Sequence, residues 1–201
     1  MFGCNRPEIK SAKVTVEATV YNDPDGDLYD SFILPISTMY FYEGHCIEEL
    51  PEALDSTLSS GTFGAYIYDQ KFAPLSRLED IEMVVPDSPI SEKKFGALFS
   101  QPPVPNYDSR EELTDTIFNG RNYKRFKIVS DSDYTVYYLN LTDSIYPYSL
   151  AKQFEKDYKG SLDRIDSYDI VNNRFTSLKM AVSDTIPSRY YSSLQSKSNE
   201  K

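Results

Sequence analysis

The stretch AKVTVEATVY, residues 12 to 21, alternates apolar and polar side chains along its whole length. Its apolar positions are Val14, Val16, Ala18 and Val20. A repeat of two residues is typical of a β-strand with one buried face. The next run, from Leu28 to Tyr42, is rich in β-branched and aromatic residues, and Pro35 indicates a bend or an edge near its middle. We therefore expect two consecutive antiparallel strands.

The segment DPDGD, residues 23 to 27, separates these two runs. Pro24 and Gly26 are suited to the tight turn of a hairpin. The alternating acids also suit a calcium ion, but the EF-hand template requires glycine and an acid where this chain has Leu28 and Leu34. A turn is the favoured interpretation and no cofactor is predicted. The metal-ligand candidates that remain are Asp23, Asp25, Asp27 and Asp30.

Further elements are expected along the rest of the chain. Strand patterns lie at residues 61–69, 123–130, 134–141 and 167–182, the last with a hairpin turn at Asn172-Asn173. Helix patterns lie at residues 51–58, 91–99, 109–119 and 150–159. The third helix has a capping box from Ser109 to Glu112 and a stop at Gly120, and in the fourth Ser149 is the cap and Gly160 the stop. The predicted fold class is α+β, with antiparallel hairpins and a few short helices packed on the sheet.

The 201 residues suffice for one ordinary domain. We expect a tether at residues 1–11, a single α+β domain at 12–194 and a disordered tail at 195–201, which contains no apolar residue. A proline-rich excursion over residues 86–108 also allows two lobes, 12–85 and 106–194.

The net charge of −10 disfavours nucleic acid and anionic lipid as partners. No apolar run reaches the roughly 18 residues of a membrane-spanning helix. The one basic cluster lies in an alternating segment, where outward charges on a strand are the expected arrangement. It consists of Arg121, Lys124, Arg125 and Lys127.

No catalytic residue is predicted. His45 is the only histidine, and the adjacent Cys46 would point to the opposite face of a strand, which is poor geometry for a thiol dyad. One histidine and two distant cysteines do not make a structural zinc site. Phosphate-binding and nucleophile-elbow motifs are absent from the sequence. An enzyme is therefore the less favoured class.

The chain contains 17 tyrosines, several of them in strand patterns. Tyrosine at alternating positions can form a surface for a partner, since it offers a rigid apolar ring and one polar group. It can equally lie at the edge of the core, and the β-propensity of tyrosine favours this second interpretation. The candidates for partner binding are Tyr40, Tyr42, Tyr66 and Tyr68, and Tyr137 and Tyr138 form a further pair.

The first four residues, MFGC, resemble the end of a bacterial lipobox, in which the cysteine becomes the lipidated first residue of a mature lipoprotein. Phe2 departs from the pattern, which usually has a small or β-branched residue there. The resemblance implies lipidation at Cys4, a location in the bacterial cell envelope, periplasmic or at the surface, and contact with the membrane only through the lipid.

The leading hypothesis is a non-catalytic envelope lipoprotein that binds another protein or a glycan. The alternative is an acidic cytoplasmic interaction protein or inhibitor that masks a basic partner, to which a charge of −10 would steer it. A small hydrolase that uses a pair of carboxylates is the third hypothesis.

Overall fold

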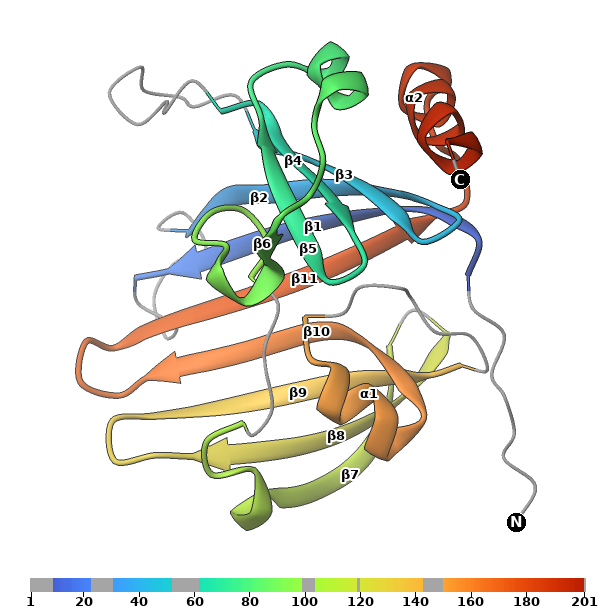
Figure 1. Cartoon of the computed structure of the whole chain (residues 1–201). Coiled ribbons are helices and arrows are strands. Elements are labelled where there is room, and N and C mark those ends of the chain that lie inside the picture. The colour runs from blue at the N-terminus through green and yellow to red at the C-terminus, as the bar shows by residue number, and fades with distance from the viewer. Residues whose placement is uncertain are drawn as a thin grey trace. The chain divides into compact units, whose positions relative to one another are not determined.

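The computed structural model describes residues 9–22, 31–51, 62–98, 104–118, 120–142 and 150–200, without the side chains of Phe32 and Pro35. Strands form most of the regular secondary structure of these residues (Figure 1). They are β1 (Ser11–Tyr21), β2 (Ser31–Tyr42), β3 (His45–Glu49), β4 (Gly64–Tyr68), β5 (Lys71–Leu75), β6 (Ser88–Pro89), β7 (Glu111–Phe118), β8 (Arg121–Val129), β9 (Asp133–Leu141), β10 (Gly160–Asp169) and β11 (Arg174–Ser183). Hydrogen bonding places them in the order β6-β5-β4-β3-β2-β1-β11-β10-β9-β8-β7.

The α-helices of the described residues are α1 (Lys152–Tyr158) and α2 (Ser188–Asn199). Three short 3-10 helices accompany them: η2 (Leu78–Met83), η3 (Ile90–Glu92) and η4 (Tyr107–Ser109). The expected α+β class is therefore wrong, because the described structure is mainly an antiparallel sheet. None of these helices is long and apolar enough to cross a membrane.

The chain forms two compact units. The first unit comprises the described residues within Glu17–Leu34 and Ser100–Met180, and the second comprises those within Ile9–Val16, Pro35–Phe99 and Ala181–Lys201. Their bounds differ from those of the two lobes suggested by the sequence, because β1, β2 and β11 each contribute residues to both units.

In the first unit, α1 packs on one face of the β8–β10 strands. The cluster beneath it consists of Tyr107, Phe126, Ile128, Leu139, Ala151, Phe154 and Leu162. Phe126 stands between two aromatic rings, stacked on Tyr158 at 5.1 Å and edge-on to Phe154 at 4.9 Å. This face of the sheet is therefore the core of the unit.

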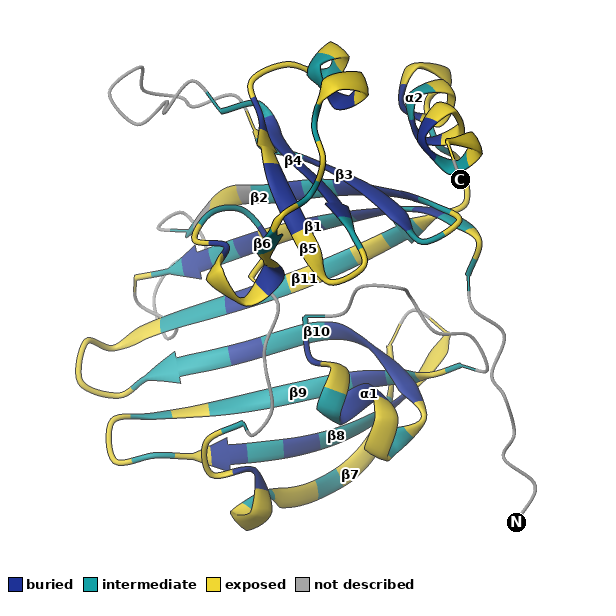
Figure 2. Cartoon of the chain, viewed as in Figure 1, coloured by how far each residue is buried: buried dark blue, intermediate teal, exposed yellow. Residues whose placement is uncertain are grey.

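In the second unit, α2 and η2 cover one face of β2 to β5. The cluster consists of Tyr40, Ile47, Tyr66, Leu75, Ile81, Tyr190 and Leu194. Figure 2 shows the buried stripe of α2 and its exposed outer side.

Several sequence predictions are confirmed. Val14, Val16 and Ala18 of β1 are buried at alternate positions. Strands were also expected, and are found, at β4, β8 and β9 and in the β10–β11 hairpin. In that hairpin turn only Asn173 of the two asparagines has a positive φ, 47°. β1 and β2 are hydrogen-bonded neighbours, but the DPDGD segment between them lies outside the described residues, as does most of the predicted helix 51–58.

The helix predicted at residues 109–119 is wrong, since this stretch is the edge strand β7. A bulge shifts its register against β8, so that Leu113 pairs with Arg125 and Thr116 with Tyr123. The half-buried positions of β7 are thus three residues apart, which imitates the period of a helix. The hydroxyl of Ser109 donates to the carbonyl of Asn106.

The helix predicted at residues 91–99 is limited to the single turn η3. Beyond it the chain curls around the ammonium group of Lys93, which donates to the carbonyls of Phe95 and Ala97 at 2.5 and 2.6 Å. Gly96 has a φ of +62° within this curl. Those carbonyls are thereby withdrawn from helix formation.

The end of the chain also differs from the prediction. Gln195 to Asn199 belong to α2, although the sequence predicted a disordered tail there. α1 ends at Tyr158 and is capped by Lys159, whose φ is 53°, and not by Gly160, which begins β10. A Cβ atom on Gly160 would lie 2.7 Å from the carbonyl oxygen of Asn140, so the glycine allows the close approach of β9. Ser149, the expected cap, lies outside the described residues, and Ala151 is the first flanking residue of the helix.

Candidate binding face

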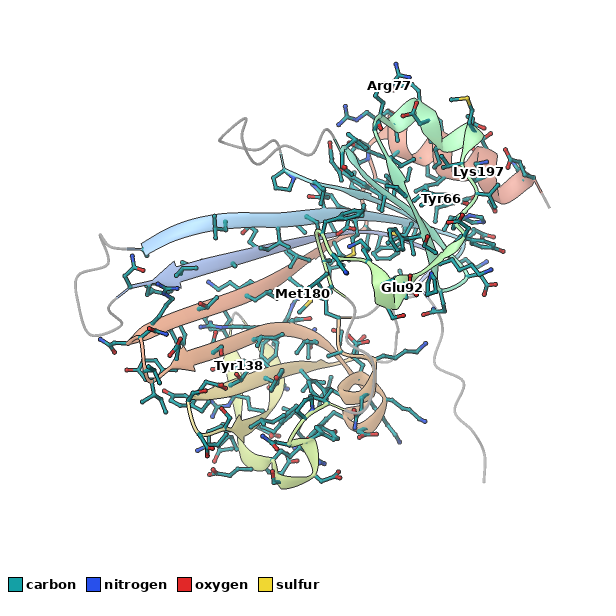
Figure 3. The ribbon with its side chains drawn as sticks, turned by 60° about the vertical axis from the view of Figure 1, so that its left-hand side comes forward. Tyr66, Arg77, Glu92, Tyr138, Met180 and Lys197 are labelled. Atoms are coloured by element: carbon teal, nitrogen blue, oxygen red, sulfur yellow. The ribbon has the colours of Figure 1, made fainter. Side chains whose placement is uncertain are left out.

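The most distinctive arrangement of polar residues lies on the first unit's sheet, on the face opposite α1. Here the strand registers align four side chains in one row across β8 to β11. Arg125 pairs with Tyr138, Tyr138 with Arg164, and Arg164 with Lys179. We call these four residues the arginine row; Tyr138 is labelled in Figure 3.

The two arginines of the row flank the ring of Tyr138. Their guanidinium carbons lie 5.8 Å (Arg125) and 5.3 Å (Arg164) from the ring centroid, and Arg164 also lies 5.9 Å from the ring of Phe118. These distances are those of cation–π contacts. Burial raises the pKa of the Tyr138 phenol, so this side chain stays neutral at physiological pH.

Each arginine is held in place by an acceptor. Arg125 donates through Nε and Nη2 to the carbonyl oxygen of Thr114, at 2.9 and 2.7 Å. Arg164 donates through Nε to Asp166, at 2.7 Å, and the hydroxyl of Ser177 donates to the same carboxylate oxygen. The guanidinium groups are thus fixed, and each is partly exposed. A guanidinium carries five N–H donors, more than these bonds use.

A second row lies four residues further along the strands. Val129 pairs with Tyr134, Tyr134 with Tyr168, and Tyr168 with Phe175. We call these four residues the aromatic row. The rings of Tyr134 and Tyr168 are 5.3 Å apart, and Val129 and Tyr134 are 52% and 37% exposed. The same face therefore presents a cationic row and an apolar row.

Two carboxylates on this face could be taken for a catalytic pair. Asp163, at the bulge of β10, accepts hydrogen bonds from Tyr123 at 3.2 Å and Ser161 at 3.0 Å, and Arg121 lies 3.7 Å away. Burial raises the pKa of Asp163, and these partners oppose the rise. Asp166 is held separately by Arg164 and Ser177. Each acid thus has its own structural partners, which do not form a shared site.

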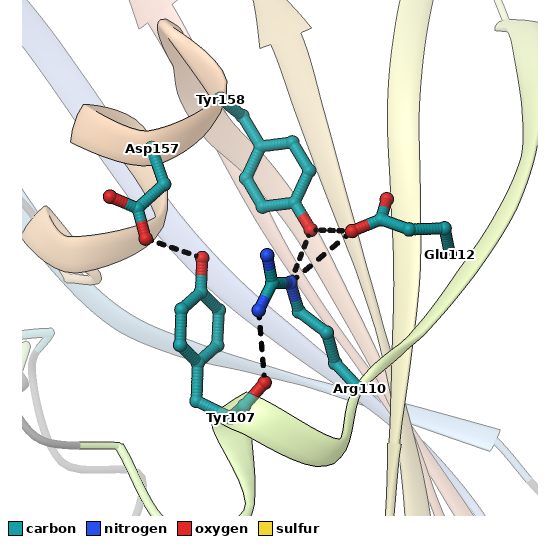
Figure 4. A network of polar contacts seen from close by, with 5 residues as sticks. All are labelled: Tyr107, Arg110, Glu112, Asp157 and Tyr158. Atoms are coloured by element: carbon teal, nitrogen blue, oxygen red, sulfur yellow. Dashed lines mark hydrogen bonds and ion pairs between the residues drawn. The ribbon is translucent and has the colours of Figure 1, made fainter.

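The opposite face carries a polar network that joins η4 to α1 (Figure 4). Tyr107 donates to Asp157 at 2.8 Å, and Arg110 donates to the hydroxyl of Tyr158 at 2.7 Å and to Glu112 at 3.2 Å. The Tyr158 hydroxyl also donates to Glu112. The guanidinium carbon of Arg110 lies 4.1 Å from the Tyr107 ring centroid. Because every group has a partner inside the network, its role is structural.

The basic cluster noted in the sequence lies on β8, and much of it is neutralised. Lys124 pairs with Asp115 at 2.7 Å, and Lys127 pairs with Glu111 at 2.8 Å. Arg121 lies near Asp163, whereas Arg125 belongs to the arginine row. These side chains do not all converge, since Lys124 alternates with the other three and points to the opposite face of the sheet.

The tyrosines proposed for partner binding lie in the second unit, on the face that α2 covers. Tyr40 stacks on Tyr190 of α2 at 3.8 Å and donates to Glu49 at 3.0 Å. Tyr42 contacts Tyr191 edge-on. Tyr66 is buried, and Tyr68 packs against the same cluster. This surface is occupied by the chain's own helix.

His45 and Cys46 point to opposite faces of β3, as their alternation predicts. Nδ1 of His45 lies 2.6 Å from the Tyr66 hydroxyl, and its ring stacks on Tyr68 at 4.1 Å. Cys46 is fully buried, and burial raises the pKa of its thiol well above the ordinary value. A thiol with a raised pKa is a poor nucleophile.

The face of β3 that bears Cys46 also holds a buried ion pair. Nζ of Lys93 lies 2.6 Å from Oε2 of Glu48, and both side chains are 0% exposed. The backbone N–H of Ala97 donates to Oε1 of Glu48 at 2.6 Å. The pair therefore closes the loop after η3 onto the sheet.

Some predicted sites cannot be located. Cys4 and the four acids Asp23, Asp25, Asp27 and Asp30 lie outside the described residues. Within the residues that are described, no group of three or more His, Cys, Asp or Glu side chains could hold a metal ion.

Sequence reasoning missed the arginine row and the aromatic row. The alternation within β8 and β9 was visible, but the rows depend on the register between strands that are separated in the sequence, and the bulge at Asp163 shifts that register. The sequence shows Tyr138 only as one of two adjacent tyrosines and does not reveal its partners on β8 and β10.

No protein-family model and no curated protein matches the chain. Among solved structures, it is similar to a crystal structure from Vibrio parahaemolyticus, described as the domain of a proposed outer membrane lipoprotein-sorting protein. The identity is 12% and the TM-score 0.28, over 94% of this chain and 93% of that one. A TM-score this low supports no argument about fold or function.

Proposed function

We propose that the chain is a non-catalytic binding protein of the bacterial cell envelope, held to the membrane by a lipid on Cys4, and that it binds its partner through the face formed by the arginine row and the aromatic row. The observation that carries the binding function is the arginine row itself. It places Arg125, Tyr138 and Arg164 side by side, and arginine and tyrosine are enriched among the residues that dominate binding energies at protein interfaces.

The position of Lys179 supports the same conclusion. It lies directly opposite Arg164 in the register of β10 and β11. Like charges at directly opposite positions destabilise a sheet. This pairing of like charges across β10 and β11 favours a role in binding over a role in stability.

The proposed anchor is supported by Gly3-Cys4 and the polar residues that follow them. Expression with the native upstream region, followed by mass spectrometry of the membrane fraction, tests it. We expect Cys4 at the mature N-terminus with a diacylglycerol adduct. A soluble protein that retains an unmodified Met1 would refute the envelope location and favour the cytoplasmic alternative.

The binding function is tested by a photo-cross-linking residue at Phe118, which is 50% exposed beside Arg164. The matched control carries the cross-linker at Arg77, an exposed position of the second unit. We expect a specific adduct from Phe118 alone, and loss of affinity for the identified, purified partner in the Tyr138→Ala variant. Equal adducts from both positions, or unchanged affinity of Tyr138→Ala, would refute this face as the binding surface.

A further inference from the structure

The charges on the candidate face differ in sign from those of the chain as a whole. The basic side chains that the registers place there are Arg121, Arg125, Lys127, Arg164 and Lys179, and the acidic ones are Glu111, Asp163 and Asp166. Each of these acids lies beside one of the basic groups, Lys127, Arg121 and Arg164 respectively. Arg125 and Lys179 form no ion pair within 4 Å with a described residue. Glu17 is a further acid, exposed on the same face of the neighbouring strand β1, whose Tyr21 contacts Phe175. The five basic and four acidic groups leave a local excess of one positive charge on a protein of net charge −10.

We propose that this face binds an acidic peptide segment of a partner protein, extended along the strands. The proposal rests on the proposed function, because it names the partner of the same face. Carboxylates of the peptide contact the arginine row, where the guanidinium forks match the geometry of a carboxylate. Apolar side chains of the peptide contact the aromatic row.

The spacing of the two rows defines the peptide. Tyr138 and Tyr134 are four residues apart on β9. At about 3.4 Å per residue, the rows are about 14 Å apart along the strand. An extended peptide advances by the same distance in four residues and returns to the same side, because its side chains alternate. The partner segment therefore carries acidic residues and, four positions away, apolar ones.

The net charge of the chain selects a short acidic segment over a long polyanion. At physiological salt, charges separated by more than about 8 Å are screened, so a bound carboxylate responds mainly to Arg125, to Lys179 and to Arg164 with its partner Asp166. A polyphosphate or a nucleic acid extends beyond the face and meets the acidic remainder of the protein. In an envelope protein, a partly apolar aromatic row also fits a peptide better than a uniformly charged polymer.

The probe is a fluorescein-labelled peptide with two glutamates and, four residues further on, two phenylalanines, and the full chain is titrated into it while fluorescence anisotropy is recorded. Removing one charged hydrogen-bonding group should weaken binding about tenfold. We expect this loss in Arg125→Gln and in Lys179→Gln. Arg77→Gln, in the second unit, is the matched control and should bind as the wild type does.

The salt dependence gives a second readout. At about 10 mM salt the screening length is about 30 Å, so the whole chain repels the peptide, whereas at about 150 mM only the local charges act. Affinity should therefore pass through a maximum near physiological salt and fall again at about 1 M. A monotonic decline from the lowest salt would overturn the balance of local attraction and overall repulsion.

Several outcomes overturn the proposal. They are equal binding of a peptide with lysines in place of the glutamates, unchanged binding by Lys179→Gln, and preferential binding of polyphosphate, of a uronic-acid polysaccharide or of anionic vesicles. Circular dichroism shows whether each variant is folded. If Arg125→Gln does not fold, Lys179→Gln still tests the proposal, because Lys179 is exposed and its replacement should not disturb the fold. If the peptide fails while the cross-linker at Phe118 still captures a partner, the acidic class is wrong and the binding function stands.

Discussion

Replacing Lys93 by methionine should destabilise the second unit by about 3 to 5 kcal/mol, because it leaves the carboxylate of Glu48 buried without its cation. The magnitude follows from the burial: both side chains are 0% exposed and the two charged atoms are 2.6 Å apart. A methionine fills much of the space of the lysine stem, so the loss measures the charge and the hydrogen bonds more than a cavity. The Lys93 ammonium also donates to the carbonyls of Phe95 and Ala97, which lose their donor.

The double variant Lys93→Met with Glu48→Gln separates the two contributions. The glutamine side chain would keep an acceptor for the N–H of Ala97, which donates to Glu48 in the wild type, and would carry no charge. We expect the double variant to recover most of the lost stability, remaining about 1 to 3 kcal/mol below the wild type because carbonyls are left unpaired. Arg77→Met is the surface control. It breaks the exposed pair with Asp80 and should cost no more than about 1 kcal/mol.

Urea denaturation followed by far-UV circular dichroism and tyrosine fluorescence measures these free energies, since the chain contains no tryptophan. A loss of less than about 1 kcal/mol in Lys93→Met would mean that Glu48 becomes protonated or hydrated at little cost, and would refute the reasoning. A double variant less stable than the single one would refute it equally, because the uncompensated charge would not then be the main penalty.

Four further results are expected. Burial raises the pKa of Asp163, so the folded state holds this proton more tightly than the unfolded chain, and the free energy of unfolding should fall as pH rises through the pKa of the folded group. The Asp163→Asn variant should lack this fall when its free energy of unfolding is measured in urea from about pH 4 upward. The same fall in the variant would contradict the assignment to Asp163. Burial raises the pKa of Tyr40 to about 12, so stability should also fall above about pH 10, and phenolate absorbance should rise in two phases, not one. Leu194→Ala should cost about 2 to 5 kcal/mol and make α2 sensitive to proteolysis, while the exposed control Ser192→Ala should do neither. Lys179→Thr should raise the free energy of unfolding by a few tenths of a kcal/mol and weaken the binding of the acidic probe peptide. A loss of stability would indicate that Lys179 stabilises the sheet.

The element that the sequence predicts most clearly is β1, whose burial alternates without interruption. Every second side chain from Ala12 to Val20 is buried, so a period of two is visible in the residues themselves. The burial of β4, β8 and β9 does not alternate strictly, and these strands are recognised by their β-branched and aromatic residues. The single half-buried face of a strand is a local property, and local patterns can be read without knowing the neighbouring strand.

β7 and α2 could not be predicted by that method. In β7, the bulge between Leu113 and Thr116 replaces a period of two by a spacing of three, and the pairing with β8 overrides the helix signals at Ser109 and Gly120. In α2, serines outnumber apolar residues. Its helix forms over the aromatic face of the second unit, where Tyr190 and Leu194 become fully buried.

The two tyrosine-rich faces show why composition alone does not locate a binding surface. Tyr40 and Tyr66 looked like candidates in the sequence, yet they lie beneath α2, where burial and hydrogen bonds account for them. Tyr138 carries the same type of side chain, but it lies between two arginines. The difference lies in the neighbours that the register supplies, not in the residue type.

One neighbour of Tyr138, Arg164, lies in register with a residue of like charge, Lys179. A threonine or a glutamate opposite Arg164 would avoid the repulsion that Lys179 introduces, and the rest of this face shows that such pairing is available, since Arg164 itself is paired with Asp166 and Lys127 with Glu111. A positive charge retained where a neutral or acidic residue would stabilise the sheet is more easily understood if its counter-charge comes from another molecule. At position 179, a neutral or acidic residue would favour the stability of the free protein, whereas lysine favours the proposed binding of an acidic partner.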